Sequence, residues 1–365
     1  MLSRPFELGG LTVPNRIAMA PMTREFSPGG VPGADVVDYY ARRAAAGVGL
    51  IITEGTYVDH PAAGTSDRVP RFYGEDALAG WRKVVDAVHA EGGTIMPQLW
   101  HVGMAREAGA PPFPDAPPSG PSGIALDADR TPSGHAMTEQ DLEDVVDAFA
   151  RAAAEAERAG FDGIELHGAH GYLIDQFLWA GTNQRTDRYG GDATARARFA
   201  ARIVTACRRV VSPGFPILFR MSQWKMNNYG ARLADTPEEL DEVLAPLVAA
   251  GVDAFHCSTR RYWEPEFEGS DLNLAGWVRQ LTGKPTVTVG SVGLDGEFVA
   301  TLMGGERTAA VSPIDPLLDR LEREEFDLVA VGRALLGDPW WAAKVLEGRD
   351  AELVPFDKGM LGELS

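Results

Sequence analysis

One short segment holds the greatest concentration of side chains that could take part in catalysis. It reads His167-Gly168-Ala169-His170-Gly171-Tyr172, with two imidazoles three residues apart and a phenol two residues further on. Imidazole and phenol groups donate hydrogen bonds and exchange protons, so their grouping favours an active site. A single histidine or tyrosine is more often a structural residue, and only the combination points to chemistry.

Other polar residues and glycines follow further short apolar runs. They are found in Ala20-Pro21-Met22-Thr23, Glu54-Gly55-Thr56, Gln98-Leu99-Trp100-His101, Arg220, Gly290-Ser291 and Gly332-Arg333. Gln98 and Arg220 could equally be satisfied polar residues of the interior. Gly290 and Gly332 could simply end strands, but together with Arg333 they resemble the phosphate site formed after strands seven and eight of many α/β barrels.

The elements that position these residues are eight short apolar runs, most of them separated by amphipathic helical patterns. We expect strands at Arg16–Met22, Gly49–Thr53, Thr94–Leu99, Gly163–His167, Pro216–Arg220, Ala254–Cys257, Thr286–Gly290 and Leu328–Val331. A helix should begin after Thr138, with Asp141 completing a capping box, and end near Gly160. Another should begin at Pro237, and Pro246 should kink it or end it early.

Eight alternating strands and helices without a composition shift predict one (β/α)8 TIM barrel over residues 1–365. An open doubly wound sheet is the alternative, although no Gly-x-Gly-x-x-Gly follows the first strand. Residues 6–13 should form a β-hairpin at the barrel bottom. The Pro- and Gly-rich stretch from Ala108 to Gly134 should be a long active-site loop after the third strand.

Composition narrows the class of protein further. A net charge of −18 makes nucleic acid an unfavourable partner, because phosphate binding needs clustered Lys and Arg. No apolar run is long enough for a membrane span, and the N-terminus does not resemble a secretory signal, so we expect a cytoplasmic protein. Cys207 and Cys257 should be ordinary buried thiols. A homo-oligomer is compatible with the sequence.

Several longer motifs resemble the old yellow enzyme family, from Phe6 to about Trp341. The most specific pieces are Gly160–Leu173 and Asn183–Gly191, supported by Pro14–Ile17 with Ala20–Thr23 and by Val331–Leu336. The resemblance implies a flavoprotein that binds FMN non-covalently across the barrel mouth and uses NADH or NADPH as reductant. It implies an ene-reductase, which reduces the C=C bond of α,β-unsaturated carbonyl compounds, with nitro compounds or nitroesters as further acceptors.

The same resemblance assigns roles to individual residues. FMN would contact Pro21, Met22, Thr23, Gly55, Gln98, Arg220, Gly290, Ser291, Gly332 and Arg333. His167 and His170 would hold the substrate carbonyl oxygen, Tyr172 would protonate the α-carbon, and Trp100 would line the substrate pocket. The permanent cation of Arg220 would also favour the anionic reduced flavin.

Two segments depart from the family pattern. Residues 221–229 are bulkier than expected and could reshape the pocket. Residues 304–325 form a longer connection than usual, which we interpret as helical and without chemistry. The chain also lacks the second half found in iron-sulfur relatives that share this barrel.

Two other functions compete with this interpretation. A metal-dependent hydrolase would use His167 and His170 as ligands, although such barrels usually place His-x-His after the first strand. No metal is therefore expected. A flavin sensor without turnover is the non-enzymatic alternative, and the presence of Tyr172 beside the histidine pair argues against it.

Overall fold

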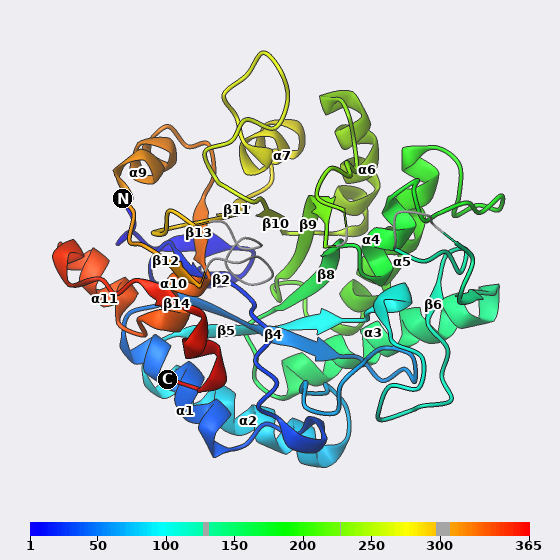
Figure 1. The fold of residues 1–365 in the computed structure, drawn as a ribbon, viewed down its shortest axis with the longest axis horizontal. Coiled ribbons are helices and arrows are strands. Elements are labelled where there is room, and N and C mark those ends of the chain that lie inside the picture. The colour runs from blue at the N-terminus through cyan, green and yellow to red at the C-terminus, as the bar shows by residue number, and fades with distance from the viewer. Residues whose placement is uncertain (127–130, 227, 297–306) are drawn as a thin grey trace.

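A closed barrel of eight parallel strands forms the centre of the protein. The computed structural model describes residues 1–126, 131–226, 228–296 and 307–365. Each barrel strand pairs in parallel with the next one along the chain, and the last pairs with the first (Figure 1). The strands are β3 Ile17–Met19, β4 Leu50–Tyr57, β5 Thr94–Trp100, β8 Ile164–His170, β9 Ile217–Lys225, β10 Ala254–Ser258, β11 Thr286–Val289 and β13 Leu328–Val331. The closure confirms the (β/α)8 prediction and excludes the open sheet.

Helices cover the outside of this barrel, as the alternating pattern predicts. They are α1 Ala34–Ala45, α2 Glu75–Ala90, α3 Glu139–Arg158, α4 Leu173–Leu178, α5 Ala193–Val210, α6 Pro237–Ala250, α7 Leu274–Thr282, α9 Asp315–Glu322, α10 Arg333–Gly337 and α11 Trp341–Leu346. Helix α3 has the expected capping box between Thr138 and Asp141. Its apolar stripe, which includes Leu142 and Phe149, is buried and fixes the helix to the barrel wall.

Helix α6 shows that Pro246 does not end it early, which was one of the two effects expected of this residue. It begins at Pro237 behind a Thr236 cap but continues through Pro246 to Ala250. The early break is absent because the buried residues of one face, among them Val243 and Leu247, hold the helix against its neighbours and compensate for the missing hydrogen bond. The helix ends at Gly251, whose φ of 107° suits glycine.

The predicted N-terminal hairpin closes the barrel bottom. Strands β1 Phe6–Leu8 and β2 Leu11–Val13 pair antiparallel. Leu8 and Val13 are fully buried in one cluster with barrel residues such as Leu50 and Leu218. The amino-terminal end of the barrel is therefore packed with apolar side chains, which leaves the carboxyl end for a site.

The connections carry short additional elements. These are η1 Pro28–Gly30, η2 Gly103–Ala105, η3 Asp350–Glu352 and η4 Lys358–Gly362, and the pairs β6 Ser119–Gly120 with β7 His135–Ala136 and β12 Thr308–Ala309 with β14 Phe356–Asp357. Helix α9 lies within the long connection expected to be helical, of which residues 304–306 lie outside the described part. Cys207 and Cys257 are free and buried, as predicted.

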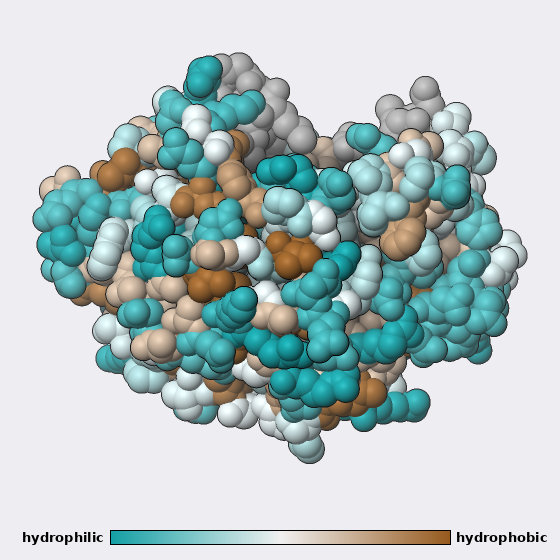
Figure 2. Space-filling view, turned by 90° about the horizontal axis from the view of Figure 1, so that it is seen from below, coloured by the Kyte–Doolittle hydropathy of each residue, from teal (hydrophilic) through white to brown (hydrophobic). Residues whose placement is uncertain are grey.

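One face of the molecular surface is mostly hydrophilic. Figure 2 shows a face on which hydrophilic residues predominate and hydrophobic ones form separate small patches. Among the described residues, no helix has the length and apolar character needed to cross a membrane.

Candidate active site

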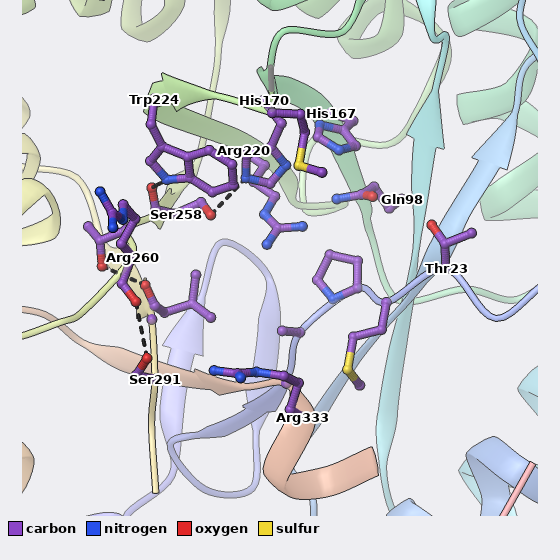
Figure 3. A pocket seen from close by; sticks show the side chains of 18 of the residues that line it. Thr23, Gln98, His167, His170, Arg220, Trp224, Ser258, Arg260, Ser291 and Arg333 are labelled. Atoms are coloured by element: carbon purple, nitrogen blue, oxygen red, sulfur yellow. Dashed lines mark hydrogen bonds between the residues drawn. The ribbon is translucent and has the colours of Figure 1, made fainter. Parts of the chain in front are cut away.

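A cavity of about 460 Å³ opens at the carboxyl ends of the barrel strands (Figure 3). Nearly all of the site residues expected from the sequence line it: Pro21, Met22, Thr23, Gln98, Trp100, His167, His170, Tyr172, Arg220, Gly290, Ser291, Gly332 and Arg333. They come from strands far apart in the chain, and barrel closure brings them around one space. This is the arrangement expected where loops and strand ends build an active site.

Gly55 is the one expected site residue that does not line the cavity. A Cβ atom at this position would lie 2.5 Å from Cε3 of Trp100. The glycine in strand β4 therefore makes room for the indole of the next strand, β5. Its contribution to the site runs through the placement of Trp100.

Tyr172 lies in a cluster of rings. Its ring is edge-on to Trp100 and to His167, with centroid separations of 4.9 and 5.0 Å. Burial raises the pKa of the Tyr172 phenol to about 12, so the hydroxyl stays protonated at neutral pH. A protonated phenol in an aromatic pocket can donate a proton or a hydrogen bond.

The two histidines have different surroundings. Nδ1 of His167 is buried and has no hydrogen-bond partner in the described structure. His170 Nε2 is 2.8 Å from Ser258 Oγ, and its ring stacks on Trp224 at 4.4 Å. Burial, reinforced by the charge of Arg220, holds the pKa of both imidazoles well below the usual value, so both are neutral. A ligand bound by both histidines would compete with Ser258 for His170.

A buried polar network lies beside the histidines. Gln98 Nε2 donates to Glu165 Oε1 at 2.7 Å, and His256 Nδ1 is 2.7 Å from Glu165 Oε2. Burial opposes ionisation of Glu165, but His256 and Arg220 outweigh it and lower the pKa of this carboxyl. The carboxylate fixes the orientation of the Gln98 amide, because it can only accept hydrogen bonds. Nε of Arg220 is buried, has no hydrogen-bond partner among the residues that the structure describes, and can serve a bound acceptor.

The other end of the cavity suits an anion. Arg333 begins α10, and its Nη2 donates to Gly296 O at 2.6 Å. Arg260 and Ser291 lie opposite in Figure 3. Gly290 has a φ of 147°, and a Cβ there would lie 2.6 Å from Thr259 Oγ1, so this position requires glycine. Where glycine lets the backbone come close to a ligand, nearby guanidinium groups can donate hydrogen bonds to a phosphate.

Sequence reasoning missed part of the lining. Trp224, Met226 and Tyr229 belong to the bulky segment that was expected to reshape the pocket, although none was named as a site residue. Asn227 of that segment lies outside the described residues. The remaining additions are Ala20, Ser258, Thr259, Arg260, Val289, Val292, Leu294, Leu336 and Leu361.

Ser258, Thr259 and Arg260 could have been found from the sequence. Ser258 ends the sixth barrel strand and the other two follow it, so the same rule that selected Arg220 at the end of the fifth strand selects them. Leu361 comes from η4 near the carboxyl end, and no sequence signal pointed to it. The stretch from Ala108 to Gly134 does follow β5, but none of its described residues lines the cavity.

Comparisons with known proteins agree with one another. A family model described as the NADH:flavin oxidoreductase / NADH oxidase family matches residues 1–352. The chain is 34% identical to an NADH oxidase of Thermoanaerobacter brockii over 95% of this chain and 50% of that protein. It is 42% identical to 12-oxophytodienoate reductase 7 of Oryza sativa subsp. japonica over 56% of this chain and 54% of that protein. The chain thus spans about half the length of these two curated relatives.

A solved structure is similar over nearly its whole length. The structure of morphinone reductase in complex with tetrahydroNAD matches with a TM-score of 0.80 and 30% identity, covering 99% of this chain and 93% of that one.

Proposed function

This chain belongs to the NADH:flavin oxidoreductase / NADH oxidase family, and from that premise we propose that it is an FMN-dependent ene-reductase. It takes hydride from NADH or NADPH and adds hydride and a proton across the C=C bond of an α,β-unsaturated carbonyl compound. The observation that carries the proposal is one cavity with arginines at one end and a partly buried, protonated Tyr172 beside two neutral histidines at the other.

The residues present fit FMN. Arg333, with Gly290, Ser291 and Gly332, would hold the phosphate, and Gln98 and Arg220 would hold the pyrimidine end of the ring. Two polar groups can hydrogen-bond the ring: the buried Arg220 Nε, which has no partner in the described structure, and the Gln98 amide, whose orientation Glu165 fixes. Pro21, Met22 and Thr23 would lie along the ring. Held by these residues, FMN would supply the hydride-transfer chemistry that links the nicotinamide to the substrate β-carbon.

The chain's own residues prepare the substrate for that transfer. His167 and His170 would donate hydrogen bonds to the carbonyl oxygen, where negative charge grows as hydride arrives. Both donate as neutral imidazoles, because burial suppresses their protonation. Tyr172 would give its proton to the α-carbon. Trp100 and Trp224 would enclose the planar conjugated part of the substrate and exclude water.

Nitro compounds and nitroesters are proposed as further acceptors, since hydride transfer to them needs no proton at carbon. The hydrolase alternative gains no support: among the described residues, no three His, Cys, Asp or Glu side chains gather to hold a metal. A single FMN-binding domain over residues 1–365, a cytoplasmic location and a homo-oligomeric state stay predictions.

The test begins with the purified protein. It should be yellow, acid should release free FMN, and NADH or NADPH should bleach the flavin without oxygen. Cyclohexenone should then restore the oxidised spectrum and yield cyclohexanone. A protein that takes up no added FMN would overturn the proposal, and a reduced flavin that cyclohexenone leaves unchanged would limit it to flavin reduction.

A further inference from the structure

A wide bulge in strand β9 faces the turn that carries His170 and Tyr172. Strands β8 and β9 pair at Gly168 with Met221, and pairing resumes only at His170 with Lys225. One residue of β8, Ala169, therefore faces three residues of β9, Ser222 to Trp224. The bulge brings Trp224 into the cavity, where its ring stacks on His170.

The turn opposite the bulge has an unusual backbone. His170 has a φ of 65° and Gly171 a φ of 85°, so two consecutive residues occupy the left-handed region. A residue with a Cβ is uncommon in this conformation and its backbone is strained there, so contacts from the surrounding structure help to hold His170 in it. The direction of the His170 and Tyr172 side chains thus depends on whatever holds this turn.

Backbone and side-chain hydrogen bonds join the turn to the bulge. The His170 N–H donates to Ser222 Oγ at 2.9 Å, and Ser222 Oγ donates to Trp224 O at 2.8 Å. The Met226 N–H donates to His170 O at 3.1 Å. On the other side of the turn, the Gly171 N–H donates to Asp175 Oδ2 at 2.6 Å.

A buried ion pair completes the link. Lys225 Nζ is 2.8 Å from Asp175 Oδ1, and the two side chains are only 2% and 0% exposed. Lys225 Nζ also donates to Ser222 O at 3.4 Å. The same carboxylate therefore binds the turn through Gly171 and the bulge through Lys225. Charges this deeply buried attract strongly, and neither is compensated without the other.

We propose that Lys225 and Asp175 are positioning residues, whose ion pair clamps the His170–Tyr172 turn to the β9 bulge and so places the His170 imidazole, the Tyr172 phenol and the Trp224 indole. Neither residue lines the cavity. Their influence on the reaction runs through the turn. The catalytic part of this inference rests on the proposed ene-reductase function.

The first test compares the two half-reactions of the FMN-loaded protein. In Lys225→Met and in Asp175→Asn, reoxidation by saturating cyclohexenone should slow by at least about tenfold, because a displacement of about 1 Å can cost about 100-fold. Flavin reduction by the nicotinamide should stay within about twofold, since it uses neither Tyr172 nor a substrate carbonyl. Equal slowing of both half-reactions, or an unchanged reoxidation rate, would overturn the clamp.

A matched control separates positioning from general destabilisation. Arg320 and Glu325 form another largely buried pair at 3.0 Å, with side chains 12% and 10% exposed, away from the cavity. Arg320→Met should lower the thermal unfolding midpoint while leaving both half-reactions unchanged. If it slows enone reoxidation as much as Lys225→Met does, the effect is not one of positioning.

A second variant covers the case in which a single change prevents folding. Lys225→Met/Asp175→Asn removes both charges together, which is tolerated better than one unpaired buried charge. The amide oxygen of Asn can still accept the Gly171 N–H. This variant should fold and bind FMN, and cyclohexenone should reoxidise it at least about fivefold more slowly than wild type. Wild-type reoxidation in the double variant would refute the need for the ion pair.

A spectroscopic readout stands apart from turnover. Near-ultraviolet circular dichroism should differ between wild type and Lys225→Met because the Trp224 stack moves, and the difference should shrink when both proteins also carry Trp224→Phe. The part that remains comes from Trp179, whose ring centroid lies 5.8 Å from Lys225 Nζ. If wild type fails to reduce enones but this difference is found, the proposed function fails and the clamp survives. If Trp224→Phe leaves the difference unchanged, the clamp fails whatever the enone activity.

Discussion

Replacing Tyr172 with Phe isolates the proton-donating step of the proposed reaction. The phenol packs edge-on to Trp100 and His167, and these ring contacts are retained by phenylalanine. Burial raises its pKa to about 12. A pH of 7 is thus about five units below the pKa of this hydroxyl, and roughly one molecule in 10⁵ carries phenolate. The substitution removes a donor that is present in nearly every molecule.

The size of the effect follows from the role. A positioned general acid contributes about 10² to 10⁴ in rate, which corresponds to about 2.7 to 5.5 kcal/mol in the barrier. Only protonation at the α-carbon needs the phenol. Reoxidation by cyclohexenone should therefore slow by this factor, whereas reduction by NADH or NADPH should be close to normal. Reoxidation by a quinone should also change little.

Stopped-flow absorbance of the flavin measures both half-reactions separately. The control is Tyr57→Phe, since Tyr57 is a buried tyrosine that packs 5.2 Å from the same Trp100 but does not line the cavity. It should leave both rates unchanged. The raised pKa keeps the Tyr172 hydroxyl protonated until the pH approaches about 12. The rate of wild-type reoxidation should therefore not fall through loss of this proton between about pH 6 and about pH 9. Equal slowing of both half-reactions in Tyr172→Phe would refute the role.

Three further changes test the cofactor end, the histidines and a buried acid. Arg333→Ala should weaken FMN binding to the apoprotein by about 1.5 to 3 kcal/mol, the usual value of a charge-assisted contact, in a fluorescence titration; unchanged affinity would place the phosphate elsewhere. We expect a para-substituted phenol, bound as a mimic of the enolate, to give the flavin a long-wavelength absorbance band. His167→Ala/His170→Ala should retain FMN but lose this band, and an unaltered band would contradict their role. Burial raises the pKa of Glu54 from 4.5 to about 7, so ionising it costs the folded state about 3 kcal/mol as pH rises through this window. Glu54→Gln should remove that fall in the thermal unfolding midpoint between about pH 4.5 and about pH 7.

The barrel could be predicted because its strands are buried on both faces. Each appears as an apolar run, and the helices between them carry an amphipathic period with cap residues such as Thr138 and Thr236. Those signals are local in the chain. Whether Pro246 would end α6 could not be decided from the sequence, because the packing that carries the helix past this residue is tertiary.

The cavity lining could be predicted because strand ends of a closed parallel barrel converge. Polar residues after a buried strand meet those after the other strands, whatever their distance in sequence. Gly55 satisfied that rule and still lies outside the lining, since its space is filled by Trp100. A glycine next to a site can leave room for a ligand or for a neighbouring protein side chain, and the sequence does not distinguish the two.

The β9 bulge marks where the sequence rule fails. We expected the fifth strand to end at the polar Arg220, yet β9 continues to Lys225 with all nine residues buried. The rule equates polar residues with exposure, and it holds only where they lack partners inside the fold. Here Gln223 accepts the N–H groups of Leu233 and Ala234, and Lys225 pairs with an aspartate fifty positions away. Such pairing exists only after the barrel has closed, so the strand that shapes one wall of the cavity extends beyond the point where its own residues suggest that it ends.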